Sequence, residues 1–127
     1  MASARALSIL VAAGRVGVGA AMLVAPSRVG RPWVGAPAET AGGTVAIRAL
    51  GVRDLAVGAL AVAALRGRLG EHAALPATLM ATGAACDVVD GMALLAARRD
   101  LPALGTATGL FALGAAAAGF TLAHRVR

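Results

Sequence analysis

The chain has 127 residues, which is enough for one domain, and 59% of them are hydrophobic while only 2% are aromatic. Ordinary soluble domains contain roughly 45–50% apolar residues, so this composition favours a membrane protein. The net charge of +6 predicts contact with membrane lipid rather than nucleic acid, because the basic residues form short scattered clusters between apolar runs. The single Cys86 excludes an intramolecular disulfide and any CxxC metal or redox site.

The first apolar segment covers about residues 6–25 and contains Arg15. It differs from a secretion signal, because Arg15 leaves only nine uncharged residues after Arg5 and three more apolar segments follow. We therefore expect a retained membrane helix. The next stretch, Pro26–Gly43, is rich in Pro and Gly and predicts a loop, with Trp33 as an interfacial anchor and Thr40 as a helix cap.

Three further apolar segments follow, at about residues 43–65, 74–97 and 101–123. Each approaches the roughly 20 residues that a helix needs to cross about 30 Å of hydrocarbon. The runs between them are short and charged, as connections between antiparallel helices are. The sequence therefore predicts a single all-α membrane domain over residues 1–127, an up-and-down integral membrane four-helix bundle. A soluble helical bundle would need a polar stripe on every helix, and residues 101–123 carry no charge.

Orientation depends on the arginines between the spans. One side of the membrane would hold Arg5, Arg66, Arg68, Arg125 and Arg127, and the other Arg28, Arg31, Arg98 and Arg99. The positive-inside tendency then favours a multi-pass protein of the bacterial plasma membrane with both termini in the cytoplasm.

Six charged residues lie inside the apolar segments, and their charges balance. The positive residues are Arg15, Arg48 and Arg53, and the negative ones are Asp54, Asp87 and Asp90. Each would cost roughly 2.5–3.5 kcal/mol alone at the centre of a bilayer. Asp87 and Asp90 share one helical face, whereas Arg53 and Asp54 project about 100° apart. We predict a buried Arg/Asp network in which Arg48 and Arg53 pair with Asp87 and Asp90, and Arg15 pairs with Asp54.

Small residues indicate where helices approach closely. Two stripes recur every four residues, Ala13–Gly17–Ala21 and Gly83–Asp87–Gly91, and a GxxxG pattern spans Gly105–Gly109. Such spacings let the backbones of membrane helices come together.

Three functions remain open from these residues. The first is a structural or small-molecule- and lipid-binding membrane module, in which the network sets which helix meets which. The second is a membrane-embedded enzyme of the isomerase or cyclase type acting on an apolar substrate. Its general acid or base would be Asp54, Asp87 or Asp90, and Arg15, Arg48 or Arg53 would stabilise an anionic intermediate. The third is a small proton-linked transporter, which would have to work as a homo-oligomer.

No metal or other cofactor is expected. The run Asp87–Gly91 opens like the metal-binding motif of CDP-alcohol phosphotransferases, but Leu94 and Leu95 stand where that motif continues with Ala-Arg. Hard cations take several oxygen ligands, and three neighbouring arginines would oppose them. We interpret His72 and His124 as interfacial side chains.

Three runs together resemble a known group of proteins: Gly14–Pro26, Arg48–Gly58 and Cys86–Ala96. The chain is similar to small actinobacterial four-span membrane proteins that form a domain-of-unknown-function family, loosely DoxX-like. Their marks are an Arg-x-x-Gly-x-Arg-Asp run in the second helix and Asp-x-x-Asp in the third. The resemblance implies a four-helix membrane fold and supplies no established activity.

Overall fold

The computed structural model describes residues 2–70 and 72–126. This part of the chain is all-helical and contains no strand, which confirms the all-α part of the predicted fold class. In chain order the helices are α1 (Ala2–Val24), α2 (Pro26–Val34), the 3₁₀ helix η1 (Ala36–Glu39), α3 (Ala41–Leu65), α4 (Leu75–Ala96) and α5 (Ala103–Arg125). The four predicted apolar segments coincide with α1, α3, α4 and α5 to within four residues at either end.

The stretch between α1 and α3 is more ordered than a loop, so that prediction was wrong. Pro26 begins α2, because its fixed backbone angle suits the first turn of a helix, where its missing N–H is not needed. Pro26 and Gly30 are buried on one face of α2, and this burial stabilises the short helix. Thr40 caps α3 as expected, since its Oγ1 accepts a hydrogen bond of 3.0 Å from the Gly43 N–H.

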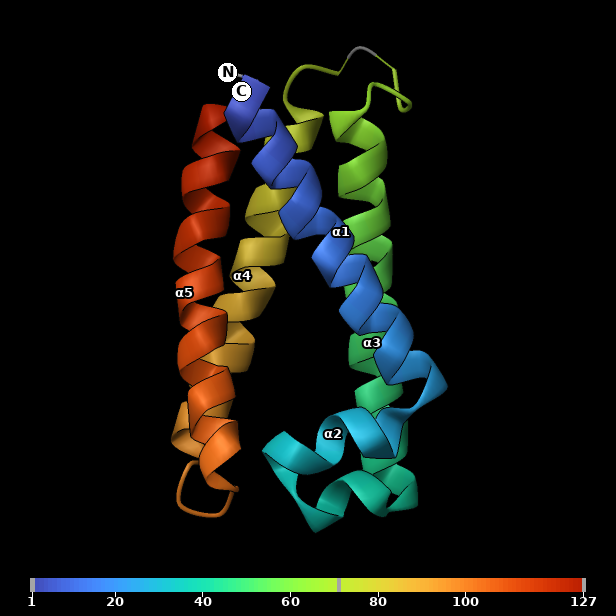
Figure 1. Ribbon diagram of the computed structural model, residues 1–127, viewed down its shortest axis with the longest axis vertical. Coiled ribbons are helices and arrows are strands. Elements are labelled where there is room, and N and C mark those ends of the chain that lie inside the picture. Colours follow the sequence, from blue (N-terminus) through green and yellow to red (C-terminus); the bar gives the residue numbers. More distant parts are fainter. Residues whose placement is uncertain (1, 71, 127) are drawn as a thin grey trace.

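The four long helices run lengthwise in two closely packed pairs, α1 with α3 and α4 with α5 (Figure 1). Both termini lie at one end of the molecule, together with the connection from α3 to α4. Glycines allow the close approach within each pair. A Cβ on Gly58 would lie 2.7 Å from the Ala12 carbonyl oxygen, and one on Gly91 would lie 2.8 Å from that of Gly109.

The predictions for the small-residue stripes are confirmed on α4 and α5 but not on α1. Gly83 and Gly91 are buried, and so are Gly105 and Gly109, as predicted. The stripe through Gly17 is exposed, and a Cβ there would meet nothing within 4 Å. A different face of α1 is turned toward α3, so the prediction of a close contact along that stripe was wrong.

Helix α2 lies across the end of the molecule opposite the termini, where the two pairs diverge (Figure 1). It contacts α1, α3 and α5. The Trp33 backbone packs against α5 so closely that a Cβ on Gly105 would lie 2.4 Å from the Trp33 carbonyl oxygen. Trp33 is half-buried, and its Nε1 donates to the Val29 carbonyl. Its role as an interfacial anchor stays a prediction.

Within residues 2–70 and 72–126, three helices, α1, α4 and α5, are long and apolar enough to cross a membrane. Their outward faces carry large exposed apolar side chains such as Leu10, Val89 and Phe111. Helix α3 has 25 residues, which is also sufficient in length, but it carries three charges. The position of these charges in the fold therefore decides how α3 can be interpreted.

Candidate functional site: an Arg/Asp network and a separate groove

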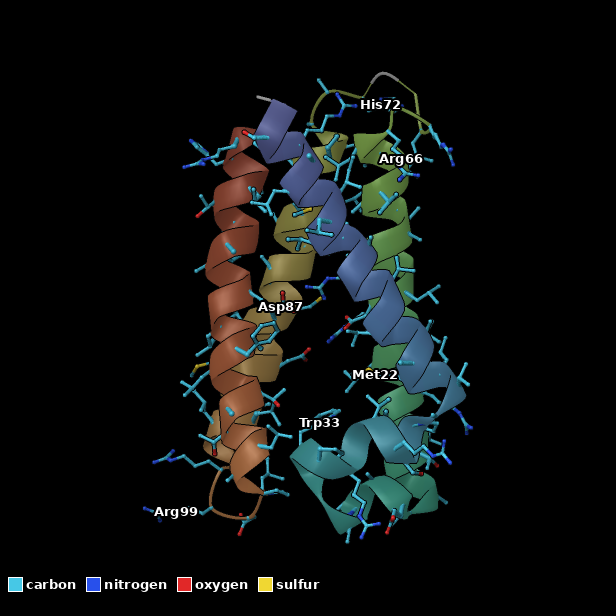
Figure 2. The ribbon with its side chains drawn as sticks, in the orientation of Figure 1. Met22, Trp33, Arg66, His72, Asp87 and Arg99 are labelled. Carbon is cyan, nitrogen blue, oxygen red and sulfur yellow. The ribbon has the colours of Figure 1, made fainter. Side chains whose placement is uncertain are left out.

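Five of the six charged residues predicted for the network meet between α1, α3 and α4. Arg15 comes from α1, Arg53 and Asp54 from α3, and Asp87 and Asp90 from α4. Asp87 lies near the middle of α4, far from the two ends of the molecule, where Arg66 and Arg99 lie (Figure 2). The network therefore occupies the central part of the bundle.

Arg15 joins α1 to both other helices. Its Nη1 donates to Asp54 Oδ1 at 3.0 Å, and its Nη2 donates to Asp87 Oδ2 and, at 3.1 Å, to the Gly83 carbonyl. Gly83 makes room for the guanidinium, since a Cβ there would lie 3.2 Å from Arg15 Nε. Only 13% of the Arg15 side chain is exposed. An alanine at position 83 would require the guanidinium to shift by a few tenths of an ångström.

Arg53 joins α3 to α4. Its Nη1 and Nη2 donate to the two carboxylate oxygens of Asp90, which gives the paired geometry that suits an arginine and a carboxylate. Its Nε and Nη2 also donate to Asp54 Oδ1 at 3.1 and 2.9 Å. Asp54 thus receives hydrogen bonds from two arginines on a single oxygen, whereas Asp87 receives one from Arg15 alone.

The predicted pairs Arg15–Asp54 and Arg53–Asp90 are present, and the prediction for Arg48 was wrong. Arg48 is exposed and its Nε donates to the Leu23 carbonyl at 3.3 Å, near the end of α1. The last carbonyls of a helix lack partners within it, and a cation there is favourable. Arg5 likewise donates to a carbonyl at the end of a helix, that of Leu65 in α3, at 2.7 Å.

The sequence reasoning did not anticipate the bond between Arg15 and Asp87. The signal was present in Gly83, because a glycine one helical turn before Asp87 leaves space for a long side chain from another helix. Without Arg48, the network contains two arginines and three aspartates and carries one net negative charge.

The space beside the network is small. A cavity of about 20 Å³ is lined by Arg15 and Asp87 together with apolar residues of all four long helices. That volume is enough for one water molecule. An apolar substrate of lipid size does not fit in that cavity, which Asp87 lines but Asp54 and Asp90 do not.

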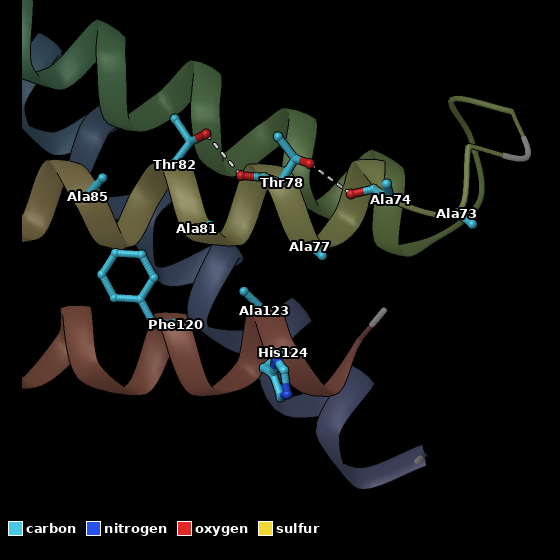
Figure 3. A pocket seen from close by; sticks show the side chains of 10 residues that line it. All are labelled: Ala73, Ala74, Ala77, Thr78, Ala81, Thr82, Ala85, Phe120, Ala123 and His124. Atoms are coloured by element: carbon cyan, nitrogen blue, oxygen red, sulfur yellow. Dashed lines mark hydrogen bonds between the residues drawn. The ribbon is translucent and has the colours of Figure 1, made fainter.

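A much larger space lies on the outer side of α4 and α5, near the chain termini (Figure 3). This groove has a volume of about 800 Å³ and is lined mostly by alanines, with Phe120 and His124 from α5. Thr78 and Thr82 also line it, but their hydroxyls donate to backbone carbonyls one turn earlier on α4. Sequence analysis did not find this groove, because it depends on how two helices lie against each other.

The network and the groove are therefore distinct sites. The cavity beside Arg15 and Asp87 has room for one water molecule, whereas the groove is far larger and has mainly apolar walls. No protein-family model, no curated protein and no solved structure matches this chain.

Proposed function

We propose that the protein is a four-span integral membrane protein of the bacterial plasma membrane that binds a membrane lipid in the groove between α4 and α5. In this proposal the Arg/Asp network has a structural role and holds α1, α3 and α4 together. The observation that carries the proposal is the groove of about 800 Å³, which lies within the roughly 300–1,000 Å³ typical of ligand sites.

The fourth span is α3. Two of its three charged residues, Arg53 and Asp54, bond to α1 and α4, and the exposed third, Arg48, donates to the Leu23 carbonyl near the end of α1. Partnered charges are tolerated within a membrane protein, where they face the interior of a bundle. An even number of spans also agrees with both termini lying at the same end (Figure 1). The greater number of arginines beside the termini supports a cytoplasmic location for that end.

Cysteine labelling in intact cells tests this topology. In a Cys86→Ser background, Arg68→Cys and Arg99→Cys place a thiol in each of the two connections that flank α4. We expect a membrane-impermeant maleimide to label only Arg99→Cys from outside, and both after the membrane is permeabilised. Labelling of both variants in intact cells would contradict the four-span arrangement.

The groove has the features that an anionic lipid requires. The alanines along α4 leave a shallow apolar channel, and the Phe120 ring points across toward that helix (Figure 3). At the end near the termini the groove reaches His124, which is exposed. Four arginines lie at that end in the described part of the chain: Arg5, Arg66, Arg68 and Arg125. An acyl chain can lie along the alanines while its negative headgroup contacts the basic end.

Native mass spectrometry of the protein extracted from its membrane tests lipid binding. Ala81→Leu fills the groove, whereas Ala13→Leu adds the same side chain at an exposed position of α1 outside it. We expect a co-purifying lipid with the wild type and Ala13→Leu, and at least a tenfold lower occupancy with Ala81→Leu. Equal occupancy in both variants would refute the groove as the binding site.

The same measurement separates this function from the enzyme hypothesis. Asp87→Asn leaves the groove lining unchanged, so lipid occupancy should stay at the wild-type level. Loss of the lipid in Asp87→Asn but not in Ala81→Leu would place the ligand at the network and favour the enzyme. The transporter hypothesis and the DoxX-like resemblance stay predictions.

A further inference from the structure

We infer that the Arg/Asp network binds one proton from water and that Asp87 holds it. The inference goes beyond lipid binding, but it rests on the proposed position of the network inside a membrane. It follows from the charge count of the network, from the unequal hydrogen bonding of its three carboxylates, and from the cavity beside one of them.

The count can be made helix by helix. The pair α1 and α3 contributes Arg15, Arg53 and Asp54, a net charge of +1, and α4 contributes Asp87 and Asp90, a net charge of −2. The sum is −1. An uncompensated charge away from water is costly, and an ionisable group in that position neutralises itself instead. Binding of one proton brings the network to neutrality.

The neighbouring groups do not supply the missing positive charge. Next to Asp87, α1 presents Arg15, α3 presents Asp54, and α4 itself carries Cys86 and Asp90. The residues of α5 beside the cavity are the uncharged Ala115 and Gly119. Arg48, the next arginine along α3, forms no ion pair within the described residues and donates to a backbone carbonyl of α1.

Asp87 is the least supported of the three carboxylates. Asp90 receives two hydrogen bonds from one guanidinium, and Asp54 receives three from two arginines. Asp87 receives one, on Oδ2. Its Oδ1 has no protein partner in the described part of the chain and is not fully buried. A proton on Oδ1 would let this oxygen donate to a water in the adjacent cavity, which has room for one.

A proton fits this site better than a metal ion. The described residues contain no group of three His, Cys, Asp or Glu side chains arranged to hold a metal. The two guanidinium groups occupy the space between the carboxylates and would repel a second cation. A proton needs only one oxygen atom.

Infrared spectroscopy of the full chain in vesicles of ether-linked lipids at pH 7 tests the inference, because a protonated carboxyl has a carbonyl band that carboxylates and ether-linked lipids lack. We expect one such band per chain in the wild type and none in Asp87→Asn. Asp100→Asn, which changes an exposed residue between α4 and α5, should retain it. Asp90→Asn should also lose the band, because two arginines then balance two aspartates without a proton.

Two results would overturn the inference. A wild type without the band carries no bound proton, and if Arg48→Gln then shows one, Arg48 is the balancing charge. A band that persists in Asp87→Asn would place the proton elsewhere. Flotation of the vesicles with alkaline extraction, done first, separates these outcomes from failure of the membrane proposal. A chain that is extracted is not embedded, and the inference then falls with that proposal.

Discussion

Arg15 bonds to both α3 and α4, and Arg15→Gln tests how much the packing of these helices depends on it. The guanidinium donates to two carboxylates and one carbonyl from two other helices. Glutamine keeps much of the side-chain volume but loses the charge and the reach to all three acceptors. Asp54 keeps its bonds from Arg53, whereas Asp87 loses its only arginine.

The expected loss in the free energy of unfolding follows from these contacts. Removing one partner of a buried ion pair costs roughly 3–5 kcal/mol. We expect the lower end, about 3 kcal/mol, because Asp54 remains paired with Arg53 and Asp87, which holds the bound proton, leaves no second charge unpaired. This lowers the ratio of folded to unfolded protein a little over a hundredfold, at about 1.4 kcal/mol for each factor of ten. The matched Arg48→Gln removes one exposed hydrogen bond of 3.3 Å and should change stability by about 0.5 kcal/mol or less.

Equilibrium unfolding in mixed micelles with increasing SDS measures both variants. The fluorescence of the single Trp33 reports on the packing of α2, and far-ultraviolet circular dichroism reports on helix content. The reasoning is refuted if both variants lose the same free energy of unfolding, or if Arg15→Gln loses less than about 1 kcal/mol, the central value for an ordinary substitution.

Three further predictions concern the fold. Gly91→Ala should cost about 1–3 kcal/mol by forcing α4 away from α5, since its Cβ would lie 2.8 Å from atoms of that helix. Gly17→Ala, with open space around it, should be neutral or slightly stabilising; equal losses in the same assay would disprove this contrast. Thr40→Ala should lower the free energy of unfolding by about 1 kcal/mol through loss of the α3 cap, and an unchanged thermal midpoint would argue against it. Arg53→Asp and Asp90→Arg should each reduce the yield of inserted protein, and the double variant should restore it because the ion pair forms again with its charges exchanged. A double variant that stays as poor as the single ones would contradict the importance of this pair.

The elements of this fold were predictable because their signals are local. The length of an apolar segment determines whether it becomes a long helix. A threonine before such a segment predicts a helix cap, because its side chain bonds to a backbone N–H only three residues later. The composition of residues 26–43 is also a local signal, and it predicted a loop where α2 and η1 form. Pro26 is tolerated because it begins α2, whereas Pro32 lies inside that helix, where a proline is unfavourable. The burial of Gly30 against Ile47 cannot be read from the sequence.

The network was only partly predictable. Spacing along α4 puts Asp87 and Asp90 on one face, and the sequence pairs arginines with aspartates by charge alone. Which arginine reaches which aspartate depends on the rotation and depth of each helix, and these place Arg48 beside the end of α1. The balanced count in the sequence therefore became an excess of one negative charge in the fold.

The groove belongs wholly to the tertiary structure. Its residues have no motif in common: they lie between Ala73 and Ala85, in α4 and the two residues before it, and between Phe120 and His124 on α5. Their small side chains form a channel only because close glycine contacts set the spacing of the two helices. By itself the sequence determined the helices, their apolar surfaces and a set of charges that need partners, since these depend on neighbours along the chain. Only the packing of one helix against another decided which charges meet and where space remains, because these depend on residues far apart in sequence.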